Sequence, residues 1–95
     1  MSEILTHAIA ALSAKLSDGF EGTAKFEITG EGTIIVDVDG VREGDEDTDV
    51  TMIASAETFR GILEGDVNPT MAFMTGKLKI EGNMGMAMKL GSALS

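Results

Sequence analysis

The chain of 95 residues contains no cysteine, no tryptophan and no tyrosine, and it has only one histidine and one proline. Without cysteine it can form no disulfide, no thiolate nucleophile and no cysteine zinc site. It also has no apolar run near 18 residues, so no transmembrane helix is predicted. Residues 1–4 lack a basic region ahead of an apolar one, which argues against a secretory signal peptide.

Basic residues are scarce as well. Seven Lys and Arg residues face 16 Asp and Glu residues, which gives a formal net charge of −9. A chain with this charge repels nucleic-acid backbones and anionic membrane surfaces as a whole, so we expect no nucleic-acid partner and no stable membrane insertion. The length suits one domain over residues 1–95.

The residue types that usually carry catalysis or hold metals are also few. His7 has no visible partner acid or nucleophile, and we interpret it as a solvated or core-edge residue. The acidic run over residues 43–49 fails as an EF-hand loop, because Val50 stands at the glycine position and Ala56 at the terminal glutamate position. We interpret it as a solvated turn. The sequence therefore predicts a non-enzymatic protein with no catalytic residue, no metal site and no cofactor.

Hydrophobic spacing predicts mixed secondary structure in the first two thirds of the chain. An amphipathic helix is expected over residues 2–16, capped by Ser2 and ended by Asp18-Gly19. Residues 22–29 and 33–39 alternate in polarity around a glycine turn, which indicates a β-hairpin with Ile34, Val36 and Val38 facing inward. A strand over residues 49–54 and a helix from the Ser55 cap to Gly65 follow.

The last third of the chain contains most of the methionines. Asn68-Pro69 indicates a helix start, Gly76 ends that short helix, and residues 77–81 alternate as a strand. Gly82-Asn83 then caps a final helix, which we expect to present Met84, Ala87, Met88 and Gly91 on one face. A second apolar side, with Met86 and Leu90, is expected to form a tunnel mouth, a homodimer contact or a membrane-touching patch.

Residues 66–91 resemble the SCP-2 (sterol carrier protein-2) sterol-transfer family. The resemblance is carried by Asn68-Pro69, Ala72-Phe73-Met74-Thr75-Gly76-Lys77-Leu78-Lys79-Ile80, Gly82-Asn83 and Ala87-Met88-Lys89-Leu90, and it extends back to about Gly22. It implies an α/β (α+β) fold with a five-stranded mixed β-sheet, helices packed on one face and an apolar tunnel between the layers. It also favours a short edge strand at Val41-Arg42.

The resemblance implies a location and a ligand class. The final residues Ala93-Leu94-Ser95 are not the Ser-Lys-Leu peroxisomal signal of many eukaryotic relatives, which favours a small bacterial-type cytoplasmic member. The implied function is the binding of a hydrophobic ligand, such as a fatty acid, fatty acyl-CoA, phospholipid or sterol, with transfer as an open further step. The candidate ligand-binding residues are Phe26, Phe59, Leu63, Met71, Met74, Leu78, Ile80, Met84 and Met88.

An empty tunnel would be costly for so small a domain. A dry cavity of roughly 300 Å³, at about 24 cal/mol per Å³, would cost about 7 kcal/mol, which is similar to the whole stability of a small domain. We therefore expect a bound apolar molecule, water, or partial collapse onto flexible methionine side chains. The alternative function is that of an accessory protein-interaction module with a collapsed core and no lipid of its own.

Overall fold

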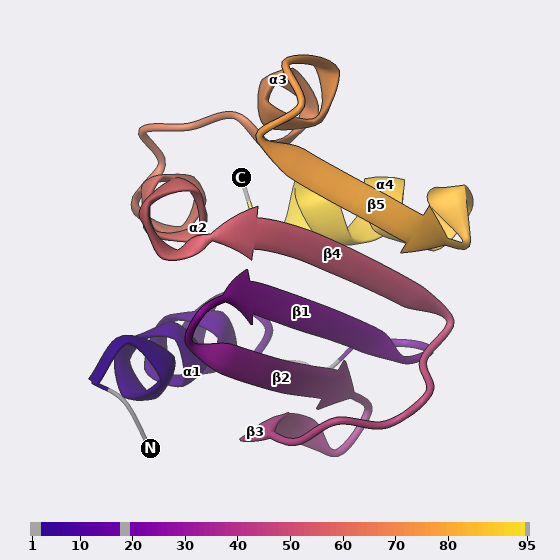
Figure 1. Ribbon diagram of the computed structural model, residues 1–95. Coiled ribbons are helices and arrows are strands. Elements are labelled where there is room, and N and C mark those ends of the chain that lie inside the picture. Colours follow the sequence, from indigo (N-terminus) through magenta and orange to yellow (C-terminus); the bar gives the residue numbers. More distant parts are fainter. Residues whose placement is uncertain (1–2, 18–19, 95) are drawn as a thin grey trace.

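The computed structural model describes residues 3–17 and 20–94 (Figure 1). These residues form a five-stranded sheet and four helices. In chain order the elements are α1 (Glu3–Lys15), β1 (Ala24–Thr29), β2 (Gly32–Asp37), β3 (Gly40–Glu43), β4 (Val50–Ser55), α2 (Ala56–Glu64), α3 (Pro69–Met74), β5 (Leu78–Gly82) and α4 (Met84–Leu94). The expected hairpin and the short edge strand are confirmed as β1–β2 and β3.

The strands lie in the order β3-β2-β1-β4-β5. β1 and β4 are parallel neighbours, whereas the other neighbouring pairs are antiparallel, so the sheet is mixed as expected. Phe26 lies opposite both Ile34 and Met52, and Met52 lies opposite Ile80. Because side chains alternate along a strand, these four residues from four strands share one face of the sheet.

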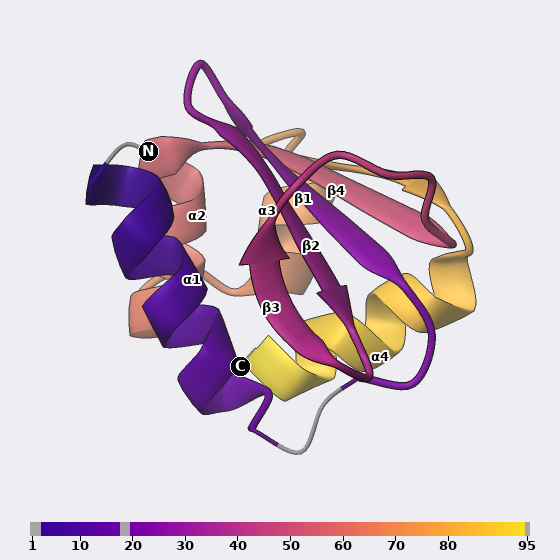
Figure 2. The same cartoon turned by 90° about the horizontal axis from the view of Figure 1, so that it is seen from below.

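The helices cover that face, and Figure 2 shows α1, α2 and α4 on the same side of the sheet. The core between the layers is apolar. From the helices it receives Leu5 and Leu12 of α1, Phe59 of α2, and Leu90 and Leu94 of α4, all of which are buried. The prediction of helices packed on one face of the sheet is confirmed, because the core is formed between these two layers.

The opposite face of the sheet carries one buried apolar residue, Ile35, which the alternation places away from the helices. The chain after β3 covers it. A side-chain carbon placed on Gly44 would lie 3.4 Å from the Ile35 Cγ1 atom. Just beyond, Asp45 Oδ1 accepts a hydrogen bond of 2.9 Å from Lys25 Nζ, and this bond raises the pKa of Lys25. The acidic run thus covers Ile35 and pairs with a lysine on the sheet.

The predicted caps are confirmed. The side chains of Ser55, Asn68 and Asn83 each accept a hydrogen bond from a backbone N–H in the first turn of α2, α3 and α4, at 3.1, 2.8 and 3.0 Å. Gly65 and Gly76 follow α2 and α3 with φ angles of +85° and +82°, the left-handed conformation that ends a helix. The Ser2 cap and the Asp18-Gly19 helix end lie outside the described residues.

Two details of the predicted apolar faces are wrong. Val38, expected to face inward, is 73% exposed, because β2 ends at Asp37 and Val38 falls in the turn that follows. In α4 the buried residues are Ala87, Leu90 and Leu94, whereas Met84 and Met88 are exposed. A helix that is apolar on two sides does not reveal its rotation through its spacing alone.

The second apolar side of α4 lies mostly in the core. Leu90 is fully buried in the core, and Met86 is half-buried. Met86 packs against the chain just before β1. Its side chain occupies the space that a side chain at position 22 would need, and Gly22 has none. Leu90 is therefore not available for a dimer or membrane contact, and a homodimer through the C-terminal helix stays a prediction.

Candidate functional site

An open groove with a volume of about 560 Å³ lies between α1 and α2, with the end of β1 at its base. Its apolar lining includes Ile28 of β1, Phe59 and Leu63 of α2, and Ala8 and Ala11 of α1. The two alanines explain why the groove exists. They lie about one turn apart on α1, and their short side chains leave the space between α1 and α2 unfilled.

The aromatic side chain at the base of the groove is held by a second ring. Phe59 lies with its centroid 4.9 Å from that of Phe26, and the two ring planes meet at 69°. This edge-to-face arrangement is a favoured geometry for aromatic pairs. Phe26 is not among the residues that line the groove, and it supports Phe59 from within the core.

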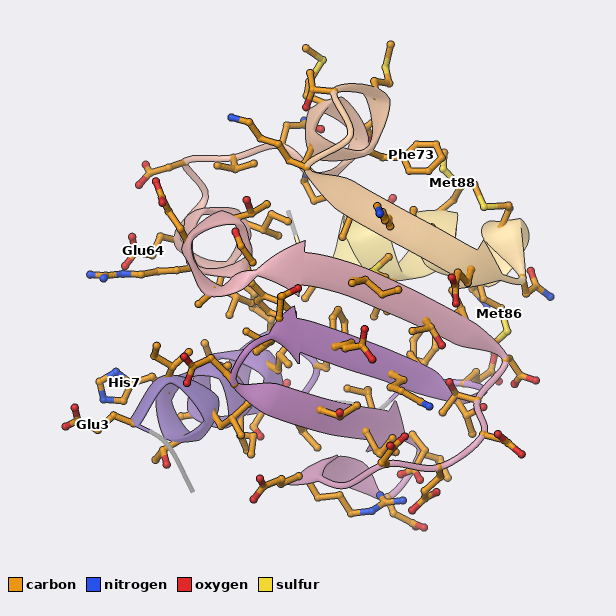
Figure 3. All side chains as sticks on the ribbon, in the orientation of Figure 1. Glu3, His7, Glu64, Phe73, Met86 and Met88 are labelled. Atoms are coloured by element: carbon orange, nitrogen blue, oxygen red, sulfur yellow. The ribbon has the colours of Figure 1, made fainter. Side chains whose placement is uncertain are left out.

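Polar side chains, most of them charged, form the rim of the groove. Glu3 and His7 come from α1, and Glu57, Arg60 and Glu64 come from α2. Figure 3 shows Glu3, His7 and Glu64 on the same side of the molecule. Arg60 Nε donates to Glu64 Oε2 at 3.2 Å across one helical turn. Three carboxylates therefore face one guanidinium, and the potential at the rim is negative.

A second, smaller cavity of about 100 Å³ lies between α3, β5 and α4. Leu78 and Ile80 of β5 line it together with Met88 of α4. This cavity and the groove are separate, because no residue lines both of them. Its volume is below the ~300 Å³ at which small-molecule pockets usually begin.

The structure thus distributes the nine candidate residues over several places. Phe59 and Leu63 line the groove, and Leu78, Ile80 and Met88 line the smaller cavity. Phe26 lies in the core behind Phe59. The other three, Met71, Met74 and Met84, are exposed and line neither space. The expected collapse onto methionine side chains is not what the structure shows, because all four methionines of the candidate set are exposed.

Sequence reasoning missed Ala11 and the charged rim. Ala11 was not singled out, because a small residue on a helix signals neither core nor cavity. Glu57 lies in the first turn of α2, where a carboxylate complements the helix dipole, so its type and place do not by themselves indicate a rim. The available signal was the spacing of Glu57, Arg60 and Glu64, which places these three residues along one side of α2.

Residues 3–17 and 20–94 contain no group of three or more His, Asp or Glu residues that could hold a metal ion. None of the helices in this part combines the length and the apolar character needed to span a bilayer.

The fold matches that of sterol carrier proteins. The solution structure of Aedes aegypti Sterol Carrier Protein-2 in complex with palmitate has a TM-score of 0.82 and 19% identity, and covers 100% of this chain and 97% of its own. The solution structure of palmitated SCP2L2 from the same organism has a TM-score of 0.71 and 26% identity, with coverages of 99% and 95%. The helix-covered mixed sheet is therefore a sterol carrier protein fold.

Residues 2–95 match the SCP-2 sterol transfer family, and the chain belongs to this family. Among curated proteins, Hydroxysteroid dehydrogenase-like protein 2 of Bos taurus is 39% identical over 88 residues, which are 84% of this chain and 21% of that protein. The Homo sapiens protein of the same name is 42% identical over 73 residues, or 68% and 18%. The chain spans about a fifth of these relatives, so their dehydrogenase-like name describes much longer proteins.

Proposed function

We propose that this chain binds an apolar lipid, single-chain or fused-ring, in the groove between α1 and α2, without catalysing a reaction. The groove itself carries the proposal. Its volume of about 560 Å³ falls within the ~300–1,000 Å³ of small-molecule sites. Its apolar lining comes from Leu63, which is partly exposed, and from Ile28 and Phe59, which are buried at its base. Two structures with this fold, the palmitate complex and the palmitated protein of Aedes aegypti, support a ligand of this type.

The energy of binding would come from removing apolar surface from water. The groove is open, so water can occupy it in the absence of ligand, and the penalty for a dry cavity does not apply. A methylene group contributes about 0.8 kcal/mol when it is buried, so eight methylenes over Phe59 and Leu63 would contribute about 6 kcal/mol before binding costs. A single hydrocarbon chain of moderate length would therefore bury enough apolar surface to bind.

The charged rim restricts the lipid head groups that the groove can accept. The phosphates of an acyl-CoA would meet Glu3, Glu57 and Glu64, with Arg60 as the one guanidinium. The lysines at positions 77, 79 and 89 are not among the residues that line the groove. We therefore favour a lipid with a small head, such as a fatty acid or a sterol-like hydroxyl compound, over an acyl-CoA.

The remaining candidate residues stay predictions. Leu78, Ile80 and Met88 would contact ligand only if it reached the smaller cavity, and Met71, Met74 and Met84 only from outside the two cavities. Phe26 would act indirectly by holding Phe59 in place. A cytoplasmic location and the step from binding to transfer likewise stay predictions.

The proposal is tested by native mass spectrometry of the purified protein, with solvent extraction of any bound molecule and titration with a fluorescent fatty acid. Ala11→Phe fills the groove from α1 and should abolish binding. Ala10→Phe is the matched control, because Ala10 is exposed on the same helix and does not line the groove. No bound lipid together with no titration by the wild type, or equal loss in both variants, would contradict the proposal.

An accessory role beside an enzyme is the second candidate function. The observation that favours it is the length of the curated relatives, in which the matching segment occupies about a fifth of a dehydrogenase-like protein. A protein partner that copurifies with the tagged chain, and is lost on substitution of surface residues that leaves the fold intact, would support this role, together with the absence of a bound lipid.

A further inference from the structure

The groove between α1 and α2 offers few hydrogen-bond donors to a ligand. Among the twelve residues that line it, only His7 and Arg60 carry a side-chain donor, because the others are apolar residues or glutamates. Arg60 already donates to Glu64. His7 is exposed and makes no hydrogen bond or ion pair with the residues that the structure describes. His7 is therefore the lining residue that has a donor and no partner of its own.

His7 lies where the charged and the apolar parts of the groove meet. On α1 it comes four residues after Glu3 and four before Ala11, so these three residues follow one side of the helix. Figure 3 shows its imidazole on the side of the molecule that also carries Glu3. A lipid whose hydrocarbon chain covers Phe59 and Leu63 would bring its polar head to the rim, where His7 lies.

The charge of the rim depends on the state of His7. In the described part of the chain, the charged groups that line the groove with it are Glu3 on α1 and Glu57, Arg60 and Glu64 on α2, and β1 contributes none. Three carboxylates and one guanidinium give a formal charge of −2, and a proton on His7 changes it to −1. Histidine is the side chain that ordinarily changes its charge between about pH 5 and pH 8, whereas carboxylic acids titrate at lower pH. Over this range, the charge that a ligand meets at the rim is therefore set by His7.

We propose that His7 recognises the head group of the bound lipid and makes the groove selective for fatty acids at mildly acidic pH. The inference rests on the lipid binding proposed above. A protonated imidazole donates a charge-assisted hydrogen bond to a carboxylate, and it offsets part of the repulsion from the three glutamates of the rim. A neutral imidazole makes only an ordinary hydrogen bond, which a hydroxyl head group forms equally well. The preference for a carboxylate over a hydroxyl is therefore lost as the pH rises.

The test uses two ligands whose own charge does not change with pH. Decanesulfonate stays anionic and decanol stays neutral, so a pH response of binding comes from the protein. Isothermal titration calorimetry measures both ligands at about pH 8 and at about pH 5.5, on the two sides of the ordinary histidine transition. The wild type should bind decanesulfonate about fivefold more tightly at the lower pH, and it should bind decanol equally at both.

Variants at position 7 separate the charge of the imidazole from its shape. His7→Gln keeps a hydrogen-bond donor but carries no charge, so it should bind decanesulfonate equally at the two pH values. His7→Lys is positively charged at both values, and it should bind decanesulfonate with the tighter affinity at both. The matched control combines His7→Gln with Ala10→His, which moves the imidazole to an exposed position of the same helix that does not line the groove. This double variant should show no pH response.

Calorimetry also supplies a readout that a purely structural role of His7 would not change. Because ligand binding and protonation are linked, decanesulfonate should bind with uptake of a fraction of a proton when the pH lies within the histidine range. The uptake is measured from the change of the binding heat among buffers with different ionisation enthalpies. Decanol should bind without proton uptake, and His7→Gln should remove the uptake that accompanies decanesulfonate.

The outcomes distinguish a failure of this inference from a failure of the lipid binding on which it rests. If the wild type binds neither ligand at either pH, lipid binding in the groove is contradicted, and the role of His7 falls with it. If both ligands bind and respond equally to pH, or if His7→Gln keeps the response, lipid binding stands and the role of His7 is overturned. Recovery of the response with Ala10→His would overturn it as well, because an imidazole away from the groove would then be sufficient.

Discussion

Thr23 and Asp49 join the parallel strands β1 and β4 just before both strands begin. The backbone N–H of Asp49 donates to Thr23 Oγ1 at 2.8 Å. In return, Asp49 Oδ2 accepts hydrogen bonds from Thr23 Oγ1 at 3.1 Å and from the Thr23 backbone N–H at 3.3 Å. The Asp49 carbonyl also accepts from the Asn83 N–H at 2.8 Å, beyond the end of β5. Asp49 therefore fixes the relative positions of three strands.

Removal of the Asp49 carboxylate should destabilise the sheet. Asp49→Ala loses two hydrogen bonds to a charged acceptor, and we expect the free energy of unfolding to fall by about 1–2 kcal/mol at neutral pH. Asp47→Ala removes the same charge from an exposed position without a hydrogen bond and should change it by less than about 0.5 kcal/mol. Urea unfolding measures both, and equal losses would refute the structural role of Asp49.

The sequence did not reveal this role, although it predicted the neighbouring elements. Asp49 appeared as one more residue of an acidic run, because its partner Thr23 is 26 residues away along the chain. The caps at Asn68 and Asn83 were predicted because each acts on the turn that follows it. Local chemistry is visible in a sequence, whereas long-range pairs depend on the topology of the sheet.

Arg42 should control the titration of Asp37. Arg42 Nη2 donates to Asp37 Oδ2 at 2.9 Å, and this hydrogen bond lowers the pKa of Asp37 below its ordinary value of 3.8. The folded protein therefore gains stability from the ionised Asp37 above about pH 4, and loses it as the pH falls through the folded pKa. Arg42→Gln should raise the pKa of Asp37 toward 3.8, as measured by carboxyl NMR titration.

The matched control for this titration is Arg60→Gln. Arg60 pairs with Glu64 on α2 and has no contact with Asp37 among those seen in the structure. The pKa of Asp37 should therefore stay low in this variant. An unchanged Asp37 titration in Arg42→Gln would show that the ion pair does not persist in solution.

The rotation of α4 leads to a stability prediction. Leu90 is fully buried and Met88, two residues earlier, is 62% exposed. Leu90→Ala should lower the free energy of unfolding by about 2–4 kcal/mol through the cavity that it leaves. Met88→Ala should change it by less than about 1 kcal/mol. Thermal unfolding of the pair decides which side of α4 faces the core.

The position of the groove could not be read from the sequence for a related reason. Phe59 and Leu63 were among the predicted ligand-binding residues, and they do line the groove. Its opposite wall depends on Ala8 and Ala11, and a small side chain on a helix does not by itself indicate a cavity. The two alanines form one side of a groove because of the distance between α1 and α2, and the packing of the whole core sets that distance.

The negative rim predicts how the groove discriminates between head groups. Glu64→Gln removes one rim carboxylate and releases Arg60 from its pair, so a ligand carboxylate would meet less repulsion and a free guanidinium. Two charges about 4 Å apart interact by about 1 kcal/mol in water, so palmitate should bind up to about fivefold more tightly. The uncharged analogue 1-hexadecanol should bind with little change, because it carries no charge for the rim to repel.

Competition against a fluorescent fatty acid measures both ligands in the same assay. Glu81→Gln is the control, because it removes the same charge from an exposed position on β5 that does not line the groove. The gain for palmitate should shrink as salt is added, since the rim is exposed to solvent. An equal gain for palmitate and 1-hexadecanol would show that the substitution acts through packing or stability, and that rim charge does not select the ligand.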